Sequence, residues 1–288
     1  MTKLNTTIII TLLSVIAVSC SGNYEKEKAA LSSLFGMEII IPDSLVCLIQ
    51  KTEIDYDMRD ADFKIITYID SADCTTCRMK LPEWDKTINS FISNENVDVA
   101  FLMIVTPRKH DNDDVRDILR RLFFNHPVAI DSEGIFIKSN NLPKETAYHT
   151  MLLDSENRIV AVGNPASNPK IRNVYSRIIN GEENANIPHL CERPADAFGI
   201  IGKGDTIVRH FSLHNNTGYA LSIQEIVPSC SCISAVISSD VISPDNTATV
   251  SVTLVADSVP GYMRRHIDIF YEEKENPERI TLHGYINN

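Results

Sequence analysis

Several signals of common protein functions are missing from this sequence of 288 residues. Basic residues number 27 against 38 acidic ones, and the net charge of −11 argues against a protein that works by neutralising phosphates. The sequence has no phosphate-cradling glycine loop, no His-Glu-x-x-His and no Gly-x-Ser-x-Gly. Internal repeats and low-complexity segments are also absent. Only one uncharged apolar run is longer than a few residues, which excludes a polytopic membrane protein.

Cysteine is scarce as well, with seven residues, too few for a miniprotein stapled by disulfides. The rest of the composition, 43 % hydrophobic and 23 % charged, is that of an ordinary folded protein. A chain of this length holds about two domains, since a domain typically has about 150 residues.

The N-terminus has the pattern of an export signal. The apolar run Ile8–Val18 is too short for a membrane-spanning helix, which needs ~20 residues, but it has the length of a signal-peptide core. The run leads into Ala17-Val18-Ser19-Cys20, which resembles the lipobox of bacterial lipoproteins, where the cysteine is acylated. We therefore predict a lipoprotein signal peptide over residues 1–19, lipidation of Cys20 and a tether over 20–37. The alternative is a simple secretory signal with a chance cysteine.

Residues 38–181 alternate between strand and helix patterns, which predicts a layered α/β domain. The expected strands are 64–70, 97–105 and 128–130, followed by a hairpin of 151–154 and 159–162. The expected helices are 78–92, 111–124 and 171–178.

After a polar linker over residues 182–197, the apolar period changes to two. Short strands separated by turn signals predict an all-β sandwich over 198–288, like an immunoglobulin domain. The expected strands are 206–213, 219–227, 230–237, 248–255, 265–271 and 279–286.

The strongest chemical signal is Cys74-Thr75-Thr76-Cys77, which follows a predicted strand and opens a predicted helix. The unpaired N–H groups at a helix N-terminus stabilise a thiolate, which favours Cys74 as nucleophile. Cys77 lies one turn later, where it can resolve a mixed disulfide. The pattern predicts thiol–disulfide exchange with protein thiols or disulfides, without a cofactor.

This strand, motif and helix resemble thioredoxin-like proteins, whose kinking proline corresponds to Pro82. The resemblance covers residues 38–180 and is greatest to lipid-anchored redoxins of Bacteroidetes envelopes. Such proteins have a cis-proline facing the two cysteines, but here that stretch is Tyr148, His149 and Thr150. We expect these three residues to line the substrate groove, with His149 near the cysteines.

The resemblance leaves two alternatives to an oxidoreductase. One is a surface scaffold or binding lipoprotein that keeps a redox fold for its shape. The other is a copper or zinc chaperone in which His149 joins the two thiolates, because these ligands suit both metals. In every case we expect an exported protein, anchored by lipid at the periplasmic face or the outer-membrane surface, with no nucleic-acid partner.

A second pair, Cys230 and Cys232, lies in the β-rich half. Its surroundings, from Asn215 to the closing Gly284, resemble a bacterial immunoglobulin-like domain of unknown function with a Cys-x-Cys signature, over residues 192–287. In an extended strand, residues two apart lie about 6.6 Å from one another, near the limit for a disulfide. A strained bridge, a soft-metal site and two small buried side chains remain open. We expect Cys47 and Cys191 to be buried thiols, with a bridge between them as the alternative.

Overall fold

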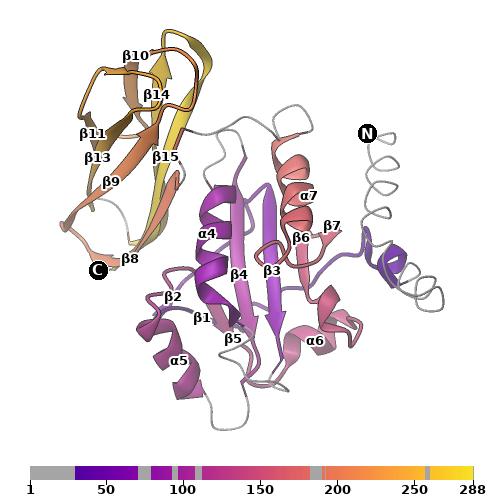
Figure 1. Ribbon diagram of the computed structural model, residues 1–288. Helices are drawn as coiled ribbons and strands as arrows, with labels where there is room; N and C mark the ends of the chain where they lie inside the picture. The colour runs from indigo at the N-terminus through magenta and orange to yellow at the C-terminus, as the bar shows by residue number, and fades with distance from the viewer. Residues whose placement is uncertain are drawn as a thin grey trace.

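The structure is a computed structural model that describes residues 30–70, 79–92, 97–107, 112–181, 190–191, 193–256 and 260–287. It has a mixed α/β domain followed by an all-β domain with two principal sheets, which confirms the predicted fold class (Figure 1).

The α/β domain is built on a seven-stranded sheet of order β2-β1-β5-β4-β3-β6-β7. Its strands are β1 Val46–Ile49, β2 Thr52–Ile54, β3 Phe63–Ile69, β4 Val99–Val105, β5 Val128–Ile130, β6 Thr150–Leu153 and β7 Ile159–Val162. Strands β3, β4 and β5 are parallel, and β6 pairs antiparallel with β3. The end of β3 and the start of β6 therefore lie at the same edge of the sheet.

Helices cover both faces of this sheet. Successive side chains of a strand point to opposite faces, and the central strands are apolar on both, so both faces must be buried. The helices are α4 Leu81–Ile92, α5 Asn112–Arg121, α6 Ile135–Asn140 and α7 Pro169–Asn180, with a 3-10 turn, η1, at Thr146–Tyr148. On one face Phe101 and Met103 of β4 pack in a core with α4, α5 and α7. On the other, Leu102 and Ile104 pack in a core with Phe136 of α6.

Three parts of this domain differ from the sequence prediction. Strands β1 and β2 and helix α6 were not expected, because each has only three to six residues and too little periodicity to detect. Within the segment predicted as a tether, residues 30–34 are helical and Leu34 is buried in the α6-side core. The helix expected over 111–124 ends at Arg121, and Phe123 has a left-handed φ of 49°.

The all-β domain has a five-stranded sheet, β12-β10-β14-β15-β8, and a three-stranded sheet, β11-β13-β9. Its strands are β8 Ala195–Gly202, β9 Thr206–His214, β10 Leu221–Pro228, β11 Ile233–Ile237, β12 Val241–Ile242, β13 Thr247–Val255, β14 Gly261–Tyr271 and β15 Lys274–Asn287. Val250 and Val252 of β13 face Ile267 and Ile269 of β14 in one core between the sheets. Strand β8 begins at Ala195, inside the segment predicted as a linker.

Candidate functional site

The predicted catalytic cysteines, Cys74 and Cys77, lie outside the described residues, as does Cys20. The elements on either side of the cysteine motif are described. Strand β3 ends at Ile69, whose carbonyl accepts a hydrogen bond of 2.9 Å from the Thr106 amide, and α4 begins at Leu81. The strand before the motif and the helix after it are therefore both present.

The first turn of α4 contains Pro82, which is the second residue of the helix rather than a kink in its interior. The Lys80 carbonyl accepts hydrogen bonds of 3.1 Å from the amides of both Glu83 and Trp84. Pro82 is tolerated because the amide it lacks would have no partner within the first turn of a helix. Lys80 itself has a left-handed φ of 42°, and Trp84, buried in the core, fixes the helix to the sheet.

The three predicted groove residues run from the last residue of η1 to the first residue of β6, beside the end of β3. Thr150 pairs with Thr67 of β3, and their hydroxyls are 2.8 Å apart in a buried hydrogen bond. The carbonyl of His149 accepts a 2.8 Å bond from the Tyr68 amide. Tyr148 is buried on the α6 side of the sheet. The structure thus brings Tyr148, His149 and Thr150 to the sheet edge from which the Cys74–Cys77 segment departs.

The His149 side chain is held by the protein. It is 5 % exposed, and its Nε2 lies 2.8 Å from the carbonyl oxygen of Pro143. Because a carbonyl only accepts, Nε2 carries the hydrogen, and a neutral ring then presents Nδ1 as an acceptor. Nδ1 is buried without a hydrogen-bond partner among the described residues. No described peptide bond is cis, so a cis-proline has no counterpart in the described part of this edge.

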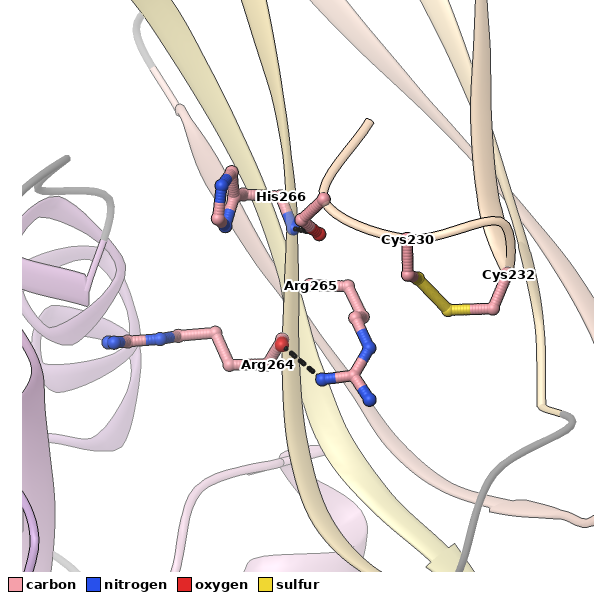
Figure 2. Close-up of a disulfide and its surroundings, with 6 residues drawn as sticks. Cys230, Cys232, Arg264, Arg265 and His266 are labelled. Carbon is pink, nitrogen blue, oxygen red and sulfur yellow. Dashed lines mark hydrogen bonds between the residues drawn. A yellow bond between two sulfur atoms is a disulfide. The ribbon is translucent and has the colours of Figure 1, made fainter. Parts of the chain in front are cut away.

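Cys230 and Cys232 form a disulfide (Figure 2). Of the three alternatives left open by the sequence, the bridge is the one found, and neither the soft-metal site nor the pair of unbridged side chains is. The placement of both cysteines in a strand was wrong. Strand β11 starts only at Ile233, and the cysteines lie in the turn before it. The turn brings their Cα atoms to 5.3 Å, closer than an extended strand allows, which accommodates the bond.

Cys47 and Cys191 do not bridge each other. Cys47 lies on β1, whereas Cys191 is buried in the core of the all-β domain. Burial, with a further contribution from Asp55, raises the pKa of the Cys47 thiol to about 11. This thiol is therefore almost fully protonated at neutral pH and is a poor nucleophile.

The sequence analysis missed a polar interface between the two domains, centred on α4. His283 of β15 lies 3.0 Å through Nε2 from the Asn89 side-chain oxygen, and the Tyr262 hydroxyl lies 2.8 Å from its Nδ1. His126, fully buried, lies 3.0 Å from a carboxylate oxygen of Asp85, and its ring centre is 5.3 Å from that of His283. No local sequence signal marked this interface, because its partners Asn89 and His283 lie 194 residues apart in the chain.

Charges at the rim of this interface complement one another. Arg193 pairs with Asp85 at 3.2 Å, and Arg264 of β14 pairs with Asp98 at 2.6 Å. Burial tends to raise the pKa of Asp85, but the hydrogen bond and charge of His126, together with Arg193, outweigh it and lower the pKa. Burial first, then His126 and Arg264, lowers the pKa of His283 well below its ordinary value, so this ring is neutral.

Within the described ranges, no group of three or more His, Cys, Asp or Glu side chains is arranged to hold a metal ion. The predicted third ligand, His149, is described, but the two thiolates that would accompany it are not. None of the helices in the described part of the chain is both long and apolar enough to cross a membrane.

Comparison with protein families assigns both domains. The Redoxin family model matches residues 42–178, and the model of a protein family of unknown function (DUF1573) matches residues 192–286. Residues 42–178 are therefore a thioredoxin-like, redoxin-type domain, and residues 192–286 after it match DUF1573. None of the curated proteins compared with the sequence matches it significantly.

Solved structures give partial likenesses. A thiol:disulfide interchange protein from Bacteroides sp. is 17 % identical over 54 % of this chain and 96 % of its own, with a TM-score of 0.38. An uncharacterized thioredoxin-like protein from Porphyromonas gingivalis is 14 % identical over 49 % of this chain and 94 % of its own, with a TM-score of 0.35.

A third similar structure is that of a protein of unknown function from Porphyromonas gingivalis W83, which is 15 % identical over 30 % of this chain, with a TM-score of 0.27. The present chain spans 42 % of that protein, less than half of its length.

Proposed function

We propose that this protein is a thiol–disulfide oxidoreductase of the cell envelope, acting through Cys74 and Cys77 and tethered by a lipid on Cys20. The observation that carries the proposal is the order of strand β3, Cys-x-x-Cys and helix α4 within a redoxin domain. The redoxin family is one of thioredoxin-like proteins, which fits exchange with protein thiols.

The proposed chemistry follows from the position of the motif before α4. Partial positive charge at a helix N-terminus stabilises a thiolate, which makes Cys74 the nucleophile. Its thiolate attacks a sulfur of a substrate disulfide, forms a mixed disulfide and expels the other substrate sulfur as a thiolate. Cys77 then attacks Cys74, which releases the second substrate thiol. Two electrons pass from the Cys74–Cys77 dithiol to the substrate in this direction, and the reverse sequence oxidises a dithiol.

A trapping experiment tests the exchange. Cys77→Ser removes the resolving thiol, so the mixed disulfide on Cys74 is expected to accumulate, whereas Cys74→Ser accumulates none. Cys47→Ser is the matched control, because the raised pKa of the Cys47 thiol keeps it out of exchange. The measurement is non-reducing gel electrophoresis of the full chain after acid quenching. Equal alkylation rates of Cys74 and Cys77, with no trapped species, would favour a scaffold with a redox-derived fold.

Fractionation tests the anchor. The apolar run before Cys20 motivates its acylation, and two or more lipid chains hold a protein stably at a membrane. Cys20→Ser is expected to move the protein from the membrane fraction to the soluble envelope fraction. A Cys20→Ser protein that still sediments with membranes after a salt wash would refute lipid anchoring without affecting the test of exchange.

A further inference from the structure

We propose that the Cys230–Cys232 disulfide is a second thiol–disulfide exchange site, which accepts electrons from a dithiol. The positive charge of the Arg265 guanidinium speeds the exchange by stabilising the thiolate that forms. The site lies in the all-β domain and does not depend on the function proposed for Cys74 and Cys77.

The location of this disulfide argues against a purely structural role. It links residues only two apart, within the turn between β10 and β11, so it ties no strand to another. Closing so short a loop removes little entropy from the unfolded chain. A structural bridge would gain most by joining distant parts of the domain.

Backbone hydrogen bonds hold the same turn without help from the disulfide. At one end, the Ser229 amide donates to the His266 carbonyl at 2.9 Å, and the His266 amide donates to the Ser229 hydroxyl at 3.0 Å. At the other end, the Cys232 carbonyl accepts a 2.9 Å bond from the Val255 amide of β13. The turn is thus attached to both sheets. Because these bonds do not involve the sulfurs, we expect the disulfide to be reduced and reoxidised while the domain stays folded.

The two cysteines differ in access, which sets the direction of attack. Cys232 is 7 % exposed, whereas Cys230 is partly exposed and is flanked by the exposed Ser229 and Ser231. An incoming thiolate therefore reaches the sulfur of Cys230 first, and Cys232 is the leaving thiolate.

Arg265 supplies a positive charge on the same side of the sheet. Along β14, side chains alternate, so Arg265 shares the inward face with the buried Met263 and Ile267. In Figure 2 its side chain extends on the side of β14 where the disulfide lies, whereas Arg264 and His266 point to the other side. One terminal nitrogen of Arg265 donates to the Arg264 carbonyl at 2.8 Å, but its Nε is buried without a hydrogen-bond partner among the described residues. A cation in this place favours the thiolate form of a neighbouring cysteine.

The balanced step is an exchange between one disulfide and one dithiol. A partner thiolate attacks the Cys230 sulfur, the Cys230–Cys232 bond breaks, and the Cys232 thiolate is released and takes up a proton. The partner's second thiol then attacks the mixed disulfide, giving a partner disulfide and the reduced Cys230. Two electrons have passed from partner to site, and a disulfide substrate reverses the sequence.

The test uses the full chain with Cys74→Ser and Cys77→Ser, so that only the second pair can exchange. Reduction by dithiothreitol at pH 7 is followed by mass-shift alkylation of Cys230 and Cys232, and circular dichroism reports folding. We expect complete reduction in the folded protein. Arg265→Gln should slow it severalfold, since a leaving thiol whose thiolate is less stabilised has a higher pKa and leaves more slowly.

Two variants make the comparison specific. Arg265→Lys keeps the charge and should restore most of the rate, and Arg264→Gln removes the adjacent charge on the opposite face and should leave the rate unchanged. Reduction only on unfolding would overturn the proposal, as would equal rates for Arg265→Gln and the parent protein. If Arg265→Gln does not fold, the parent protein still decides: a bond reduced no faster than the domain unfolds is structural.

Discussion

The bond between His149 and the Pro143 carbonyl gives this imidazole a structural role at the edge of the sheet. His149→Ala is expected to lower the free energy of unfolding by about 1–3 kcal/mol, because the partly buried Pro143 carbonyl loses its hydrogen-bond donor and the buried imidazole is removed. Urea unfolding measures the change. His210→Ala is the control, since this histidine is exposed and should change stability by less than about 0.5 kcal/mol. Equal stability of His149→Ala and the parent protein would mean that water replaces the imidazole.

A second residue-scale prediction concerns pH. His283 has a folded-state pKa well below its unfolded value of about 6.5, because of burial and the neighbouring His126 and Arg264. Between these two values the unfolded chain binds a proton that the folded chain does not. The titration of His283 therefore lowers the free energy of unfolding as the pH falls below about 6.5, by up to ~1.4 kcal/mol per pH unit.

Urea unfolding at pH 7.5, 6.5 and 5.5 checks this dependence. His283→Gln removes the titrating group, so its stability should fall less steeply with acid than that of the parent protein. The exposed His214 provides the control, since His214→Gln should keep the parent slope. Parallel pH profiles for His283→Gln and the parent would contradict the buried, neutral state of His283.

Residue positions were predicted better than residue roles. The resemblance placed Tyr148, His149 and Thr150 just before a strand, and in the structure Tyr148 ends η1, His149 follows it and Thr150 begins β6. The hydrogen bond of His149 to Pro143 was not predicted, because it depends on a side-chain rotamer and a local turn that no spacing rule encodes. The disulfide was only one of three open alternatives for Cys230 and Cys232, because the sequence indicated a strand where the structure has a turn.

At the scale of the elements, the residue before α4 has a backbone conformation that is unfavourable for its side chain. Lys80 adopts a left-handed φ of 42°, which costs an L-residue roughly 1 kcal/mol and costs glycine nothing. Lys80→Gly is therefore expected to raise the free energy of unfolding slightly or leave it unchanged. Lys86→Gly, in the exposed middle of the same helix, should lower it by about 1 kcal/mol.

Thermal and urea unfolding of the two variants provide the comparison. Both replace a lysine by glycine in or next to α4, so their difference isolates the backbone conformation. Equal losses in the two variants would mean that Lys80 has no left-handed strain to relieve.

Long elements were predictable and short ones were not. Strand β4 and helix α4 have enough residues for their apolar periods to be read directly. The first three residues of strand β8, Ala195–Ala197, were assigned to the linker, because residues 182–197 are mostly polar and hold two prolines. They become part of a strand by pairing in parallel with β15, a partner more than seventy residues later. Local patterns do not contain such tertiary information.

For the molecule as a whole, the interface at α4 should make the two domains unfold together. Asn89→Ala combined with Arg264→Ala removes the hydrogen bond to His283 and the ion pair with Asp98. Calorimetry is expected to show one transition for the parent protein and two for this double variant. Lys86→Ala with Arg209→Ala is the control, because neither residue lies among the interface contacts described above. A single, unchanged transition in the double variant would show that these contacts do not couple the domains.

This interface was beyond sequence analysis for a simple reason. Asn89 and His283 are 194 residues apart, and each is unremarkable among its neighbours in the chain. Their relation exists only once both domains are folded and packed. The order of the two domains was predictable from the change of apolar period, but the way they contact each other was not.

The position of β15 has a consequence for how the protein is made. Strand β8 comes first in its domain along the chain, yet its ladder partner is β15, which comes last. During synthesis, the emerging β8 segment must therefore wait without its ladder partner until more than seventy further residues have followed. His283, which contacts α4, arrives with the same late strand. The contacts between α4 and His283 can therefore form only after β15 has been synthesised, later than every strand of the redoxin domain.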